Sequence, residues 1–276
     1  MTARLNERDI AAFEPEAKIG LLATVNPEGQ PHLTLITSLR AKTPTQLMFG
    51  QFTEGRSKAH LQENPHAGFL VMNAEREVWR GTARWTHAAR EGEDYVLYNQ
   101  QPMFRYNTYF GVHTVHYLDL VDFAGSAHLA LPRIAAGSLA AKVAGGLHRP
   151  EHPVLKPWAR SHIAALGTLK FLAHVGEDGF PRIIPVVPTY PAGNRLLFVP
   201  TVYRDELGAF EPNTPVAVLA LNLQMESVLV RGTFTGFRRV RGVRAGAIDL
   251  DWVYNTMPPV PGQVYPEVPL QVVEQF

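Results

Sequence analysis

The sequence predicts a mainly β protein with short helices, built from two tandem copies of a small β-barrel. Three observations carry this prediction: a long-range repeat, short apolar runs separated by turn residues, and an Ala-rich segment between the copies. The chain has 276 residues, of which 46% are hydrophobic and 18% are charged. This is enough apolar material for two domains of ordinary size.

The repeat becomes visible when the chain is compared with itself at a shift of about 150 residues. The segment Glu28-Gly29-Gln30-Pro31 returns as Asp178-Gly179-Phe180-Pro181, and Arg80-Gly81-Thr82 returns as Arg231-Gly232-Thr233. The shift changes only from 149 to 151 residues between Leu47 and Arg80. Such a small drift is expected when loops gain or lose single residues while paired strands keep their length.

Between the copies, Arg133–Gly146 is rich in Ala and Leu and ends in two glycines, and prolines follow at 150, 153 and 157. This order predicts a short helix, a glycine stop and an extended connector. We therefore expect a first barrel domain over residues 1–131, a linker over 132–153, and a second barrel domain over 154–276.

The first copy begins with two apolar, β-branched runs, Ile19–Val25 and Leu33–Leu39, on either side of Asn26-Pro27-Glu28-Gly29. This is the residue chemistry of a hairpin turn, so the two runs should pair antiparallel. Further strands are expected at 47–49, 67–72 and 78–85, with a helix over 57–63. Many short strands with one small helix favour a barrel.

The charge balance argues against several classes of function. Lys and Arg number 26 against 25 Asp and Glu, which gives a net charge of +1 and no basic surface for nucleic acid. Cysteine is absent, which excludes disulfides and thiolate-ligated metals. Met1–Ile10 lacks the pattern of a secretory signal, and no apolar run is long enough for a membrane helix. We expect a cytoplasmic protein without membrane or nucleic-acid partners.

An anion site is predicted where a strand ends and the helix over 57–63 begins. Arg56, Ser57 and Lys58 offer two cations and a hydroxyl beside the unpaired N–H groups of a helix N-terminus. A phosphate monoester is the usual occupant of such a site. The alternative is a solvated helix end with ordinary surface charges.

The same region carries several motifs in a fixed order. They are Gly29-Gln30-Pro31, the strand His32–Leu39, the segment Gly55-Arg56-Ser57-Lys58-Ala59-His60, and Asn64-Pro65. In this order the sequence resembles the FMN-binding split-barrel flavoproteins typified by pyridoxamine 5'-phosphate oxidase.

The resemblance implies FMN as the cofactor and assigns residues to it. The phosphate would be bound by Arg56, Ser57 and Lys58. Four residues would line the flavin: Thr34, Leu35, Ile36 and Thr37. Beyond those implied by the resemblance, Gln51 and Trp79 are further candidates for contacts with the cofactor. Trp79 is equally well explained as a core residue. Members of this family are usually homodimers, so the two copies would form an intrachain pseudo-dimer, and a further homodimer of the tandem chain stays open.

Departures from the family pattern bear on the substrate. Thr34 stands where an oxidase of vitamin B6 has Arg, Leu39 stands near an expected Lys, and Gln271–Phe276 lacks the Arg-containing substrate segment. Vitamin B6 oxidation is therefore not expected. In the second copy the phosphate segment is replaced by Asp205, Glu206 and Leu207, whose carboxylates would repel a phosphate. We predict one flavin per chain.

Two other features of the first copy leave alternatives open. The extra segment Glu91–Phe110 contains six aromatic residues, which would either form a wall for a flat ligand or pack the segment onto the barrel: Tyr95, Tyr98, Phe104, Tyr106, Tyr109 and Phe110. His113 and His116 have ligand-like spacing, but their Val/Thr/Tyr surroundings favour a strand, on which they face opposite sides. No metal site is expected.

The function that follows is an FMN-dependent oxidoreductase acting on an unknown small-molecule substrate. No residue is an obvious catalytic acid or base. Two alternatives use the same fold: a flavin or haem binder without turnover, acting as a sensor or carrier, and a deazaflavin-dependent reductase with a longer anionic cofactor tail. An absorption spectrum separates the three.

Overall fold

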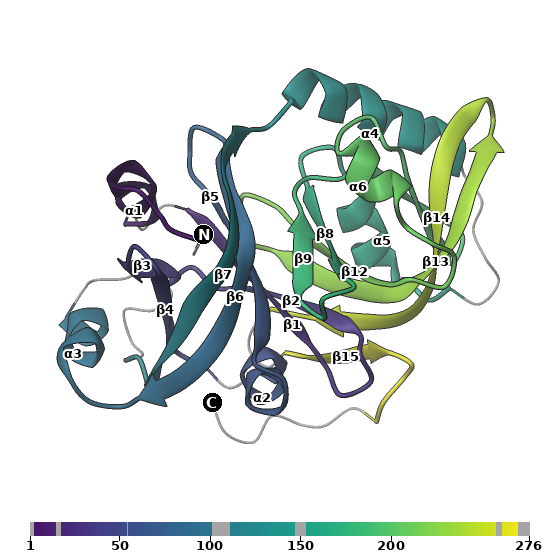
Figure 1. Cartoon of the computed structure of the whole chain (residues 1–276). Helices are drawn as coiled ribbons and strands as arrows, with labels where there is room; N and C mark the ends of the chain where they lie inside the picture. The colour runs from purple at the N-terminus through teal and green to yellow at the C-terminus, as the bar shows by residue number, and fades with distance from the viewer. Residues whose placement is uncertain are drawn as a thin grey trace. The chain divides into compact units, whose positions relative to one another are not determined.

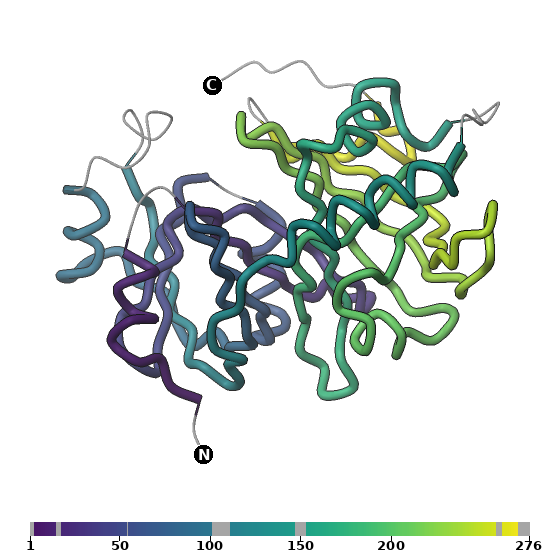
Figure 2. Tube along the Cα trace, turned by 90° about the horizontal axis from the view of Figure 1, so that it is seen from above, coloured from purple at the N-terminus to yellow at the C-terminus, as the bar shows by residue number. Residues whose placement is uncertain are grey.

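The computed structural model describes residues 3–14, 18–53, 55–100, 111–146, 153–257 and 261–269. The chain divides into two compact units (Figure 1). Unit 1 consists of Met1–Leu129 with Val175–Ile183, and unit 2 of Ala130–His174 with Ile184–Phe276. In Figure 2 the chain runs from purple to teal over residues 1–129 and on to yellow at the C-terminus. The two units are described separately.

Unit 1 contains a seven-stranded antiparallel sheet in the order β2-β1-β5-β6-β7-β4-β3. Its strands are β1 (Ile19–Val25), β2 (Pro31–Leu35), β3 (Arg40–Thr43), β4 (Gln46–Gln51), β5 (His66–Met72), β6 (Glu77–Ala89) and β7 (Thr114–His128). Its helices are α1 (Glu7–Phe13), α2 (Arg56–Glu63) and α3 (Glu93–Gln100).

The first hairpin forms as predicted. β1 pairs antiparallel with β2, with Leu21 opposite Leu35. The turn between them closes because the Asn26 side-chain oxygen accepts from the Gln30 N–H at 2.7 Å and because Gly29 adopts a φ of +75°. The observed pairing of β1 with β2 therefore matches the hairpin predicted from the sequence.

The strand expected over 33–39 is shorter than predicted and ends at Leu35. Ile36 leaves β2 because its N–H donates to the Gly20 carbonyl at 2.7 Å, and the Leu39 N–H then donates to the Ile36 carbonyl at 3.2 Å. Gly20 allows this close approach, since a Cβ there would lie 2.3 Å from the Ile36 oxygen. The chain turns here and re-enters the sheet as β3.

The core of unit 1 lies inside the curved sheet. Apolar side chains from α1 and from five strands meet there with almost no exposure: Phe13, Leu22, Leu47, Phe49, Phe69, Val71, Trp79 and Leu118. Helix α2 packs against β1 and β2 and buries Leu61. This packing places the start of α2 beside the edge strand β2.

Unit 2 contains most of a second antiparallel sheet, in the order β10-β11-β14-β13-β12-β8-β9, with β15 paired to β14; Val175 of β8 and residues 181–183 of β9 are assigned to unit 1. Its strands are β8 (Leu169–Val175), β9 (Pro181–Ile184), β10 (Thr189–Ala192), β11 (Arg195–Phe198), β12 (Pro215–Leu221), β13 (Ser227–Val240), β14 (Val243–Asn255) and β15 (Gly262–Tyr265). Its helices are α4 (Leu131–Gly145), α5 (Pro157–Ala164) and α6 (Arg204–Gly208).

The two sheets have the same strand order when strands are matched in chain order, β8 with β1 through β14 with β7. The predicted mainly β class with short helices is thus confirmed, in two compact units whose antiparallel sheets have the same strand order. The pseudo-dimer concerns the mutual placement of the units and stays a prediction. No helix in the described ranges is long and apolar enough to cross a membrane.

A helix forms where the linker was expected, but it belongs to unit 2. Ala141 and Ala144 of α4 pack with Leu197 and Val199 of the β11 region in one buried cluster. The close approach depends on small residues, since a Cβ at Gly137 would lie 2.2 Å from the Thr201 hydroxyl oxygen. The Ala and Gly content that suggested a linker therefore reflects close packing of a helix on a sheet.

Candidate functional site

The start of α2 has the properties of an open anion site. The N-cap residue Gly55 is extended and provides no side chain, and the first turn contains no acidic residue. Most N–H groups of a first helical turn have no partner within the helix and carry partial positive charge, and in α2 the Lys58 N–H donates to the Gly55 carbonyl at 3.2 Å. In the described part of the chain, no side chain caps those of α2.

Ser57 links this helix start to the edge strand β2. Its side chain is buried, at 1% exposure, and its hydroxyl contacts the hydroxyl of Thr34. The structure thereby brings together two segments of the predicted site that are 23 residues apart in sequence.

Lys58 is half-buried on the same turn. Burial lowers the pKa of its ammonium group, and no carboxylate of the described residues forms an ion pair with it. A desolvated cation without a counter-ion gains from an anionic ligand. Arg56, two residues earlier, is exposed. The donor set therefore fits the phosphate group of a nucleotide such as FMN.

Gln51, at the end of β4, is held by two residues that were not among the predicted contacts. The Gln51 side-chain oxygen lies 2.7 Å from Nε2 of His116, and the Trp85 indole N–H donates to Nδ1 of His116 at 3.2 Å. His116 is 3% exposed and stacks on the Phe49 ring. Burial, and then the charge of Lys58, lower the pKa of His116 to about 4, so this imidazole is neutral at pH 7.

The predicted strand character around His116 is confirmed by its place in β7. His116 is buried within β7, whereas His113, which precedes the strand, is exposed. No group of three metal-ligating side chains occurs among the residues that the structure describes. The residue types around His116 predict a strand, but they do not predict the contacts of His116 with Trp85 and Gln51.

The remaining residues that were predicted to contact the flavin differ in their burial. Leu35 and Thr37 are half-buried beside Thr34, whereas Ile36 is 6% exposed and packs into the core. Trp79 is 1% exposed, and its indole N–H donates to the Asp9 carboxylate at 2.9 Å. Trp79 therefore has the surroundings of a core residue.

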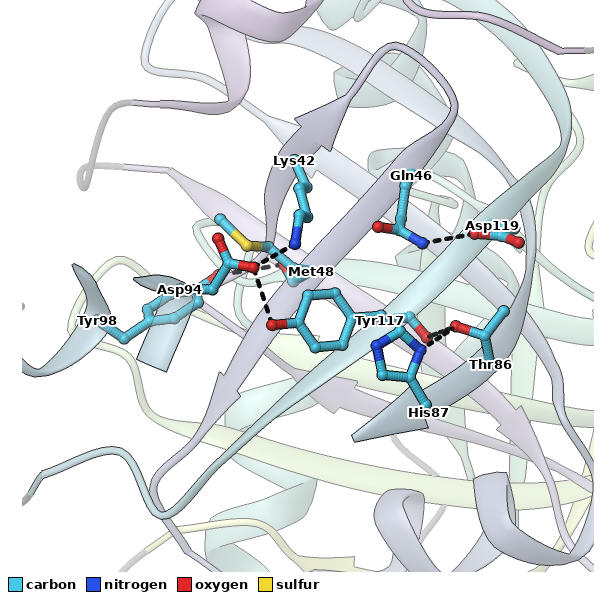
Figure 3. Close-up of polar contacts among 9 residues, drawn as sticks. All are labelled: Lys42, Gln46, Met48, Thr86, His87, Asp94, Tyr98, Tyr117 and Asp119. Carbon is cyan, nitrogen blue, oxygen red and sulfur yellow. Dashed lines mark hydrogen bonds and ion pairs between the residues drawn. The ribbon is translucent and has the colours of Figure 1, made fainter. Parts of the chain in front are cut away.

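The extra segment of the first copy is anchored through α3 (Figure 3). The carboxylate of Asp94 forms an ion pair with Lys42 and accepts from the Tyr117 hydroxyl at 2.8 Å. Burial would raise the pKa of Asp94, but these two donors outweigh it and lower the pKa. On the Tyr117 side, burial followed by the bond to Asp94 raises the pKa of the phenol to about 12. The His87 ring stacks on Tyr117 at 4.3 Å.

Tyr98 connects α3 to the candidate site. Its buried hydroxyl lies 2.8 Å from the Ser38 carbonyl and 3.2 Å from the Met48 carbonyl. Ser38 in turn exchanges hydrogen bonds with the main chain of Gly50. The described part of the segment therefore packs onto the sheet. Four of its aromatic residues lie outside the described residues: Phe104, Tyr106, Tyr109 and Phe110.

Unit 2 has no counterpart of the anion site at the matching place. Helix α6 has only five residues, and Asp205 and Glu206 occupy its first turn. Leu207, which matches Lys58 in the repeat, is fully buried. Carboxylates at this helix start complement its partial positive charge and repel an anion.

Residues 7–118 match the family model of pyridoxamine 5'-phosphate oxidase. The matched range ends within β7 and contains all the residues placed at the site, from Thr34 to His116. It covers most of the first copy of the repeat and none of the second.

Solved structures with similar folds were also found. An FMN-binding protein from Syntrophomonas wolfei has a TM-score of 0.37 and 15% identity, over 46% of this chain and 85% of that one. An F420 reductase has a TM-score of 0.34 and 17% identity, over 44% and 98%. An FAD-binding protein from Mesorhizobium loti has a TM-score of 0.28 and 13% identity, over 44% and 96%. The comparison with curated proteins gave no match.

Proposed function

We propose that the chain is an FMN-binding flavoprotein whose first copy holds the phosphate of the cofactor. The observation that carries the proposal is the start of α2, where Ser57 and the half-buried Lys58 lie beside β2 without an acidic partner among the described residues. The family match over residues 7–118 supports it, because the matched range contains this helix and this strand.

In the proposed site, Arg56, Ser57 and Lys58 bind the phosphate together with the N–H groups of the first turn of α2. The flavin ring lies along residues 34–37. β2 is the outermost strand of its sheet, so one edge of its main chain is not used for strand pairing. Thr34 contributes both to this edge and to the position of the Ser57 hydroxyl.

We further propose an oxidoreductase acting on a small molecule. Bound flavin supplies hydride-transfer chemistry, and the protein supplies binding, orientation and exclusion of water. Two positions set the substrate apart from a B6 phosphate. Thr34 has no charge, and Leu39 is fully buried in the core, so neither provides a cation to a phosphorylated substrate.

The test is an equilibrium titration of the purified full-length protein with FMN, riboflavin, a deazaflavin and haem, followed by absorption and by quenching of flavin fluorescence. Mass spectrometry of any cofactor that copurifies identifies the natural ligand. We expect FMN to bind most tightly, and riboflavin to bind more weakly because it lacks the phosphate. Preference for the deazaflavin or haem, or no binding of FMN, would refute the proposal.

A further inference from the structure

The side chains of Trp85, His116 and Gln51 form a chain of hydrogen bonds across three neighbouring strands. They belong to β6, β7 and β4, which are adjacent in the sheet. The indole Nε1 lies 3.2 Å from His116 Nδ1, and His116 Nε2 lies 2.7 Å from the Gln51 side-chain oxygen. His116 is almost completely buried, so water does not compete for its ring nitrogens.

The donor chemistry of tryptophan fixes the direction of this chain. An indole N–H donates and never accepts, so Nδ1 of His116 must be the acceptor. A neutral imidazole then carries its proton on Nε2, which donates to Gln51. The partner atom on Gln51 must therefore be the amide oxygen, and the amide NH₂ group remains as its free end.

Gln51 lies close to the candidate site. Gln51 is half-buried and immediately precedes the segment that leads into α2. Lys58 is close enough for its charge to act on His116. No hydrogen-bond partner of the Gln51 amide nitrogen is found among the residues that the structure describes.

We propose that Trp85 and His116 are positioning residues that hold Gln51 as an obligate hydrogen-bond donor to an acceptor oxygen of the bound flavin. The inference rests on the proposed function and adds a specificity element to it. The site demands an acceptor at this place, because the amide cannot rotate to offer its oxygen without breaking its bond to His116. A ligand with a donor group there leaves two donors facing each other and is rejected.

The binding test uses variants of Gln51 in the full-length protein. Gln51→Leu should weaken FMN binding about fivefold, the loss of roughly one neutral hydrogen bond. Gln51→Glu keeps the shape but replaces the donor with an anionic acceptor, so it should weaken binding more than Gln51→Leu does. Equal losses for FMN and riboflavin place the acceptor on the riboflavin part, and a loss for FMN alone places it on the phosphate. Wild-type affinity in Gln51→Glu would overturn the inference.

A double-mutant cycle separates positioning from a merely structural role. Trp85→Phe should weaken FMN binding about twofold to fivefold in the wild-type background and have no effect in the Gln51→Leu background. A loss of equal size in both backgrounds would show that Trp85 acts through the fold and not through Gln51.

Nitrogen NMR of ¹⁵N-histidine-labelled protein tests the relay without any ligand. We expect His116 to carry its proton on Nε2 at neutral pH, and a proton on Nδ1 would overturn the inference. The outcomes also separate the two proposals. If FMN does not bind, the proposed function fails and this inference fails with it. If FMN binds and Gln51→Leu matches the wild type, only the inference fails.

Discussion

Replacing Lys58 by Met removes one positive charge from the proposed phosphate site and keeps most of the side-chain volume. A charge-assisted hydrogen bond contributes about 1.5–3 kcal/mol, so the affinity for FMN should fall roughly 10- to 150-fold. Riboflavin lacks the phosphate, so its affinity should change less than about twofold. The ratio of the two dissociation constants, from fluorescence titration at fixed ionic strength, measures the contribution of the phosphate contact.

The same substitution makes an independent prediction about the ligand-free protein. Because burial lowers the pKa of Lys58, folding disfavours its charged form at pH 7. The unfolding free energy should therefore rise with pH between the lowered pKa and 10.5, and Lys58→Met should remove this slope. At pH 7 the variant should melt at the same temperature as the wild type or higher.

Lys142→Met is the matched control, because Lys142 is exposed on α4 in unit 2. It should leave the affinities for FMN and riboflavin unchanged. Equal losses of FMN and riboflavin binding in Lys58→Met would refute the phosphate contact. A clear loss of stability in the ligand-free variant would show that the charge of Lys58 is stabilised within the protein.

Four further expectations follow from the same structure. Saturation should require one FMN per chain, and two equivalents of similar affinity would contradict the difference between the copies. Trp79→Phe should lower the unfolding free energy by about 2–3 kcal/mol in urea, because it leaves the Asp9 carboxylate without its donor, and should leave the FMN affinity unchanged. Between pH 6.5 and 4 the unfolding free energy should fall by about 3 kcal/mol, because His116 becomes protonated in the unfolded chain but stays neutral in the folded protein. The substitution His116→Phe should flatten this pH dependence. Tyr98→Phe should cost about 1–2 kcal/mol of stability, read from the urea midpoint, since the hydroxyl bonds the Ser38 carbonyl.

The strands predicted best are those with a clear apolar pattern in their own sequence. The run Ile19–Val25 forms β1 with the predicted bounds, because nearly all of its side chains are buried. β3, Arg40–Thr43, was missed, since it has little apolar pattern and depends on pairing with β4. The early end of β2 was missed for a related reason, because it follows from the bond of Ile36 to Gly20 in another strand.

In the candidate site, too, some features can be predicted from the sequence and others cannot. The segment around Arg56 and Lys58 is contiguous, so its charge and spacing are visible in the sequence. The contacts of His116 span 31 residues to Trp85 and 65 to Gln51. A register shift in the pairing of β6 with β7 falls between Trp85 and His87, and alternation along a strand does not predict such a shift. Contacts of this kind follow only from the folded sheet.

The packing of α4 on unit 2 changes how the junction between the two copies should tolerate insertions and cuts. β7 ends at His128 and α4 begins at Leu131, so the join itself is only two residues long. Added residues between 131 and 145 would shift Gly137 and the buried alanines out of register with β11, as an insertion in a core helix does. A fragment that begins at residue 154 would lose this helix and expose the apolar surface beneath it. A fragment that begins at residue 130 would keep the helix, and the apolar surface would stay covered. The segment between the two copies is part of the core of unit 2, so packing constrains its length.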